Sequence, residues 1–183
     1  MHETVVALQS IDSGRNAVID DREELERILE SLPDDELMYC VIPLHWISQP
    51  DLMPTDYKTL VTIKGQIVSA LGEPGTVNGI RDPLWLVCVN GELRIANGYH
   101  RYEALDQLAS DDSGFSQNVF VRIENGEPDK LWKMMLEGAG NHRTVAPARF
   151  VRFMRDYWNE TDIGRQVSLA DAISYIGQDR SAR

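Results

Sequence analysis

Hydrophobic and polar positions follow two different periods along this chain, one typical of helices and the other of strands. In DDREELERILESLP, apolar residues recur at every third or fourth position and the pattern stops at Pro33, which predicts a helix over residues 21–32. The same spacing predicts helices over residues 55–72, 99–109, 127–140, 146–158 and 168–177. Apolar and β-branched runs predict strands over residues 38–47, 83–89, 92–98 and 118–123, the first of them with Pro43 at an edge or a bend. The pair Asn90-Gly91 lies between the second and third of these runs and predicts a tight hairpin there.

The order of these elements predicts an α/β (α+β) fold, with a small mixed sheet and flanking helices. The last predicted strand ends near residue 123, and only helices are predicted after it. The chain therefore divides into three predicted parts: a helical N-terminal extension (1–37), an α/β domain (38–139) and a helical C-terminal segment (140–183).

The charge of the chain argues against a generally basic nucleic-acid-binding surface. The 183 residues carry a formal net charge of −11, whereas binding to a nucleic acid backbone needs Lys and Arg to neutralise phosphates. Residues 140–183 differ, with seven Arg against five Asp and Glu. Cys40 and Cys88 lie in apolar runs without metal-ligand spacing, so we expect two buried, reduced thiols. Because the sequence shows no signal peptide and no membrane-length apolar run, we expect a soluble, cytoplasmic protein without a membrane partner.

The stretch ELRIANGYHRYEAL carries the strongest chemical signal in the sequence. A predicted strand ends in Asn97-Gly98, a predicted helix begins at Tyr99, and Gly98 thus falls at the junction of strand and helix. Backbone N–H groups and the dipole at the start of a helix favour an anion, and Arg101 in the first turn can bind two phosphate oxygens at once. The junction is therefore a candidate phosphate site, although a glycine at a helix start can also serve backbone geometry alone.

This junction resembles a known sequence motif. GYHRYEAL is similar to the GxxRxxA box of the ParB/sulfiredoxin superfamily, with Gly98, Arg101 and Ala104 at the three fixed positions. Upstream, GIRDPLWLVCVNGELRIANGYHR resembles the family's order of loop, strand, hairpin and box, and CVIPLHWI resembles its opening strand. The resemblance covers about residues 38–125 in order, and it implies the ParB/sulfiredoxin fold for this part of the chain.

The resemblance also implies a site for Mg²⁺ with a nucleoside triphosphate such as CTP or ATP. In this superfamily the polyphosphate lies on the box, so Gly98 would admit the phosphates, and His100 and Arg101 would donate hydrogen bonds to them. The loop before Pro83 matches the family's first nucleotide-contacting segment, where Arg81 would neutralise a phosphate or stack on a base. The residues implied in this way are Arg81, Asn97, Gly98, Tyr99, His100 and Arg101.

Three branches of the superfamily differ in their chemistry. Sulfiredoxins need a cysteine where this chain has Tyr99, so sulfinic acid reduction is not expected. The free-serine kinases use a similar box with a carboxylate base, for which Glu73, Asp82 and Glu103 are candidates. The sequence leaves open which residues are catalytic and whether the protein is an enzyme, such as a CTPase or a kinase.

In the ParB branch, the nucleotide domain continues into further helices. EGAGNHRTVAPARF resembles the segment in which ParB proteins carry an ENxxR motif, and Arg143 fits its arginine, with His142 beside it. Residues 139–140, Ala-Gly, stand where the motif has its acid and its metal-binding asparagine, so CTP hydrolysis is not implied. After a local shift, Asn141 becomes the candidate metal ligand and Glu137 the candidate acid.

Residues 168–177 resemble part of a helix-turn-helix, with Ser168 as the helix cap and Gly177 at the turn. The leading hypothesis is a ParB-like, nucleotide-dependent switch in DNA partitioning, regulation or a mobile-element role. DNA or a protein would then contact residues 140–183, and a ParB-like clamp would need a homodimer. Two alternatives stay open: a phosphotransferase, kinase or nucleotide hydrolase of the same fold, and a non-catalytic interaction module with a degenerate pocket.

Overall fold

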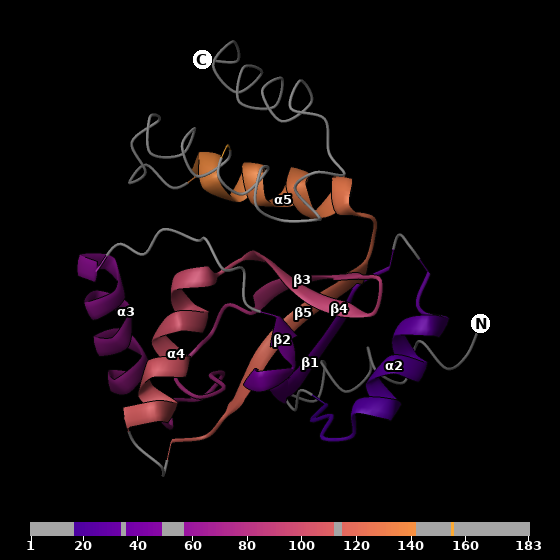
Figure 1. Ribbon diagram of the computed structural model, residues 1–183. Coiled ribbons are helices and arrows are strands. Elements are labelled where there is room, and N and C mark those ends of the chain that lie inside the picture. The colour runs from indigo at the N-terminus through magenta and orange to yellow at the C-terminus, as the bar shows by residue number, and fades with distance from the viewer. Residues whose placement is uncertain (1–16, 34–35, 49–56, 112–114, 142–154, 156–183) are drawn as a thin grey trace.

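The computed structural model describes residues 17–33, 36–48, 57–111, 115–141 and 155 (Figure 1). Their helices are α2 (Arg22–Ser31), α3 (Tyr57–Ser69), α4 (Tyr99–Asp111) and α5 (Pro128–Asn141), together with a 3₁₀ turn at Leu44–Trp46. Their strands are β1 (Met38–Pro43), β2 (Ile47–Ser48), β3 (Leu84–Val89), β4 (Glu92–Asn97) and β5 (Asn118–Asn125). These elements confirm the predicted α/β fold with a mixed sheet. Apart from Arg155, the helices predicted over 146–158 and 168–177 lie outside the described residues.

The five strands form one mixed sheet in the order β1-β5-β3-β4-β2. β3 and β4 pair antiparallel on either side of the predicted Asn90-Gly91 turn, and both turn residues have a positive φ, as such turns require. β5 lies between β1 and β3, antiparallel to β1 and parallel to β3. β2 pairs parallel with β4 at the other edge.

The single strand predicted over residues 38–47 is wrong in one respect, because it is two strands separated by the 3₁₀ turn. Pro43 ends β1, since proline has no N–H for a further ladder hydrogen bond. The chain then reaches the opposite edge of the sheet at Ile47. Four residues span at most about 14 Å, whereas the edges of a flat five-stranded sheet lie about 19 Å apart. The sheet therefore curls, which brings β1 and β2 toward each other.

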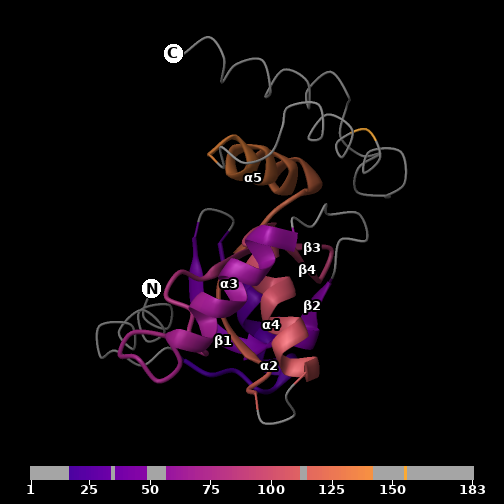
Figure 2. The same cartoon turned by 90° about the vertical axis from the view of Figure 1, so that its left-hand side faces the viewer.

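Helices cover both faces of this curled sheet. Side chains from one face of the strands form the main core with α2, α3 and α4, and α3 packs alongside α4 (Figures 1 and 2). The largest fully buried side chains of this core are Leu25, Ile42, Leu84, Leu86, Leu93, Leu105, Val119, Val121 and Ile123. α5 contacts β3 and β4, and its Leu131 and Met135 are buried, as is Val87 at an alternate position of β3. None of the described helices is long and apolar enough to cross a membrane.

Cys40 and Cys88 differ in burial, although the sequence predicts both to be buried. Cys40 in β1 is buried, and burial raises the pKa of its thiol to about 12. Cys88 lies near the hairpin turn and is only half-buried; burial raises the pKa of its thiol, while a hydrogen bond with the Gly91 backbone and the charge of Arg22 lower it. We expect a disulfide reagent at mildly alkaline pH to modify Cys88 slowly in the folded protein, and Cys40 only after unfolding in urea. Equal reaction rates of the two thiols in the native protein would contradict this expectation.

Candidate phosphate site at the start of helix α4

Gly98 connects β4 to α4. Its φ of 98° is a backbone conformation that side chains disfavour, and its carbonyl oxygen accepts the N–H of Tyr102 at 3.0 Å, so it is the N-terminal cap of α4. A Cβ at this position would lie 2.7 Å from Cδ2 of the buried Leu84 and 3.0 Å from Nη2 of Arg101. Backbone conformation and space therefore both require glycine at the junction.

The guanidinium of Arg101 lies against Gly98 and joins α4 to the loop before β3. Its Nη1 donates hydrogen bonds to the carbonyl oxygen of Asp82 at 2.5 Å and to that of Pro83 at 3.1 Å. Burial lowers the pKa of the Arg101 guanidinium, and the charge of Asp82 opposes this shift. Within the described part of the chain, both hydrogen bonds of Arg101 come from Nη1. The arginine is thus held in a fixed position at the start of the helix.

The loop before β3 brings further charges to the same place. Arg81 is exposed and forms an ion pair with Glu73, with 2.8 Å between Nη2 and Oε2. Asp82 is also exposed, and its charge acts on Arg101. Because two carboxylates accompany the two arginines, the site is less positive than the arginines alone would make it.

The other residues predicted for the box lie around the helix start. Asn97 is the last residue of β4 and pairs with Trp85 of β3. The rings of Tyr99 and His100 make an edge contact with 6.2 Å between their centroids, and both residues are half-buried. The structure therefore places the six predicted residues in the loop before β3 (Arg81) and at the junction of β4 with α4 (Asn97 to Arg101), the two segments that Arg101 joins. That they bind a nucleotide stays a prediction.

The second predicted segment falls largely outside the described residues. Asn141 is the last residue of α5, and Glu137 lies in the same helix, but their side chains are outside the described part, as are His142 and Arg143 entirely. Among the described residues, no group of three or more His, Cys, Asp and Glu could hold a metal ion. The metal-binding role of Asn141 stays a prediction.

The three candidate acids of the site occupy different positions. Glu73 pairs with Arg81, Asp82 lies near Arg101, and the Glu103 carboxylate accepts a hydrogen bond from Gln107 at 3.3 Å, within α4. Sequence reasoning missed the Glu73 pair and the carbonyl acceptors of Arg101. These contacts join residues 8 and 19 positions apart, and no local pattern specifies the conformation of the loop between them.

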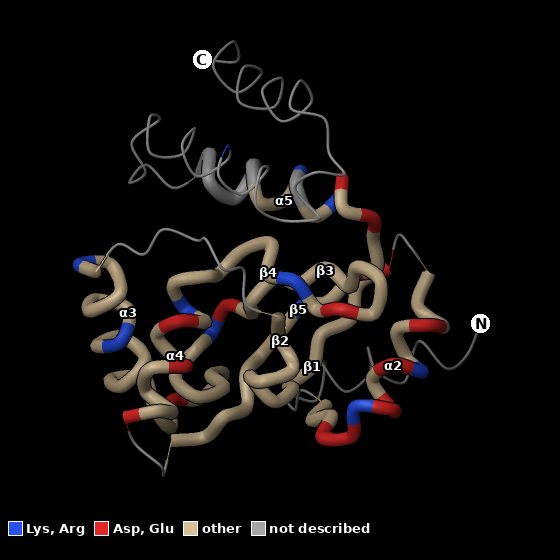
Figure 3. The backbone as a smooth tube through the Cα atoms, viewed as in Figure 1, with Lys and Arg blue, Asp and Glu red and all other residues tan. Residues whose placement is uncertain are grey.

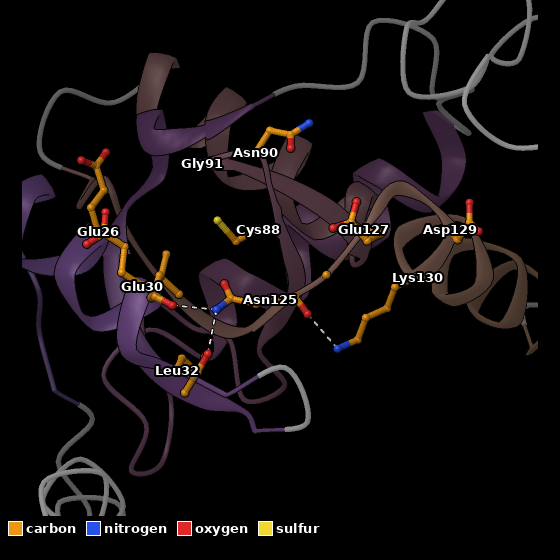
Figure 4. Close-up of a pocket in the computed structure, with 12 residues that line it drawn as sticks. Glu26, Glu30, Leu32, Cys88, Asn90, Gly91, Asn125, Glu127, Asp129 and Lys130 are labelled. Carbon is orange, nitrogen blue, oxygen red and sulfur yellow. Dashed lines mark hydrogen bonds between the residues drawn. The ribbon is translucent and has the colours of Figure 1, made fainter.

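A cleft of about 860 Å³ lies at the turn of the β3–β4 hairpin, at the other end of β4 from Gly98 (Figure 4). It is lined by α2, the Asn90-Gly91 turn and the start of α5, and its carboxylates are Glu26, Glu30, Glu127 and Asp129. The six residues of β4 separate that turn from Gly98, which is roughly 20 Å along an extended strand. Because carboxylates repel a polyphosphate, we do not assign the predicted nucleotide site to this cleft.

This chain is similar to solved structures of ParB proteins, among them isolated ParB N-terminal domains. No family model matches the sequence, and no curated protein sequence is significantly similar to it. A pNOB8-like ParB N-domain is 13% identical, with a TM-score of 0.47, and the match covers 68% of this chain and 46% of that one.

Two further matches are structures of the C-terminally truncated chromosome-partitioning protein ParB from Caulobacter crescentus. The complex with the centromeric parS site is 10% identical, with a TM-score of 0.44, and the match covers 75% of this chain and 64% of that one. The complex with CTP-γ-S is 16% identical, with a TM-score of 0.37 and coverage of 64% and 61%. The chain thus spans less than two thirds of each of these structures.

Proposed function

We propose that this protein binds a nucleoside triphosphate, CTP or ATP, together with Mg²⁺ at the start of α4, and that the bound nucleotide acts as a switch. The observation that carries the proposal is the fixed guanidinium of Arg101 at the glycine cap of α4. The positive end of the helix dipole and a positioned arginine both favour a phosphate at this point.

The two terminal nitrogens of the Arg101 guanidinium have different surroundings. Nη1 donates to the carbonyl oxygens of Asp82 and Pro83. Nη2 lies next to Gly98, 3.0 Å from the position that a Cβ would occupy there. A planar guanidinium anchored at one nitrogen can offer another to a phosphate oxygen without losing further side-chain freedom. Arg81, His100 and Asn97 would contact the remaining parts of the nucleotide.

The switch would connect the helix start to the C-terminal segment. His142 and Arg143 would contact the same phosphates, and Asn141 would complete the coordination of a Mg²⁺ held mainly by phosphate oxygens. A ligand that contacts two segments stabilises one of their relative positions, which is the physical basis of a population shift. Residues 140–183 would then engage DNA or a protein partner, with the chain as a homodimer, in partitioning, regulation or a mobile-element role.

Calorimetric titration of CTP, ATP, ADP and GTP with Mg²⁺ tests this proposal. We expect saturable binding of at least one nucleotide, weakened about tenfold or more by Arg101→Ala, because a charge-assisted hydrogen bond to phosphate is lost. Arg27→Ala on the exposed side of α2 removes the same charge and should leave the affinity unchanged.

Arg101→Ala also removes the anchor of the loop before β3, so its folded state is checked by circular dichroism and urea unfolding. Arg101→Lys, which keeps the charge but not the planar geometry, should bind with intermediate affinity. Wild-type affinity in a folded Arg101→Ala variant, or no saturable binding of any nucleotide to the wild type, would refute the proposal.

A further inference from the structure

The carboxylate of Glu73 is held in a defined position next to Arg81. Glu73 lies in the turn after α3, where its N–H donates to the carbonyl oxygen of Ala70 at 3.1 Å. Its own carbonyl oxygen accepts the hydroxyl of Thr76 at 2.8 Å. From this turn Oε2 reaches Nη2 of Arg81 at 2.8 Å, although the Arg81 and Glu73 side chains are 70% and 46% exposed. The pair therefore joins the end of α3 to the loop of the candidate phosphate site.

Arg81 directly precedes the two residues whose carbonyl oxygens hold Arg101. Its position is thus linked to the start of α4 through the Asp82 and Pro83 carbonyl groups. A carboxylate and a phosphate bind the same donors of a guanidinium, with similar geometry. A phosphate that takes the Nη2 hydrogen bound by Glu73 therefore displaces this carboxylate, and a phosphate on any other N–H of Arg81 is repelled by it.

We propose that Glu73 is an internal competitor for Arg81, which lowers the affinity of the site for a phosphate-bearing ligand. This inference rests on the proposed function, since it concerns the ligand of the same site. Free-energy measurements on exposed ion pairs correspond to a factor of roughly 2 to 5 in an equilibrium constant. Removing the competing carboxylate strengthens nucleotide binding by that factor, and the gain decreases as salt screens both interactions.

The test compares Glu73→Gln with Glu26→Gln in nucleotide titrations at low and high salt. Glu26 is a matched control because it forms an exposed ion pair with Arg22, also at 2.8 Å, on α2, which lies away from α3 and α4 (Figure 3). Both substitutions remove one negative charge from the chain. We expect a gain of about 2- to 5-fold in affinity for Glu73→Gln at low salt, a smaller gain at high salt, and no change for Glu26→Gln.

Adding Glu73→Gln to an Arg81→Gln background separates competition from a general charge effect. In that background the gain should disappear, because the carboxylate no longer has an arginine to occupy. An affinity for Glu73→Gln equal to or weaker than that of a nucleotide-binding wild type would overturn the inference and leave the proposed function standing. A gain that persists without Arg81 would also overturn it. Absence of binding to every variant would refute the proposed function itself.

Discussion

Replacing Gly98 with alanine should lower the free energy of unfolding by about 2–4 kcal/mol. Two terms contribute. A non-glycine residue at a φ of 98° is strained by roughly 1 kcal/mol or more. The added Cβ would also approach Cδ2 of Leu84 to 2.7 Å, and because Leu84 is fully buried in the main core, relieving this contact costs about 1–3 kcal/mol of repacking.

Gly65→Ala in α3 is the matched control for this substitution. A Cβ at Gly65 meets no atom within 4 Å, and the residue lies inside a helix with an ordinary helical φ. Alanine should therefore stabilise the protein there, by about 0.5–1 kcal/mol, through higher helix propensity. Urea unfolding of the two variants should give changes of opposite sign. A Gly98→Ala variant as stable as the wild type would show that the junction adopts another conformation.

Gly98→Ala should also weaken nucleotide binding at temperatures where the variant is folded. The new methyl group would lie 3.0 Å from Nη2 of Arg101, so the guanidinium must move away from the helix start. In the proposed site this nitrogen faces the phosphate, and the displacement removes the fixed geometry on which binding depends. The same glycine thus serves the geometry of the fold and the candidate site.

Local sequence patterns predicted the parts of the fold whose contacts are close in sequence. The Asn90-Gly91 hairpin and the strand-glycine-helix order around Gly98 depend on neighbouring residues, and both are present. The insertion of β5 between β1 and β3 depends on pairing between distant segments, which no local period specifies. A bend at Pro43 was predicted, but the separate strand β2 after it was missed, because the buried apolar positions continue through Leu44 in the turn to Ile47 beyond it.

The candidate site likewise has features that local sequence predicted and contacts between distant residues that it did not predict. The candidate residues at 97–101 were predicted from the sequence, since Gly98 and Arg101 of the box lie at one helix start. The hydrogen bonds from Arg101 to the loop at Asp82 and Pro83 could not be predicted. Their acceptors are backbone carbonyl groups, which every residue has, so the sequence does not mark them. The Glu73–Arg81 pair was missed because both residues are exposed and lie in a loop between α3 and β3.

A second large effect is expected at Glu124, which joins α5 to the sheet. Glu124 is 7% exposed, and its two carboxylate oxygens pair with Nη2 of Arg122 at 3.3 Å and with Nζ of Lys130 at 2.9 Å. Lys130, in the first turn of α5, also donates to the carbonyl oxygen of Asn125 at 2.8 Å, while the Arg122 guanidinium lies 4.4 Å from the centre of the Trp85 ring. One buried carboxylate thus holds a cation from the strand and another from the helix.

Glu124→Ala should therefore destabilise the protein by about 2–4 kcal/mol, because it leaves two largely covered cations without their shared partner. The matched control is Glu92→Ala, which removes a strand carboxylate two residues from its partner Arg94. Glu92 is 54% exposed, so its loss should cost about 0.2–1 kcal/mol. Nucleotide affinity should also fall in Glu124→Ala, because α5 leads to Asn141 and the segment proposed to contact the phosphates. Urea unfolding and titration of the two variants measure both effects. Equal stability losses at Glu124 and Glu92 would show that α5 is held by its apolar side chains and does not need this carboxylate.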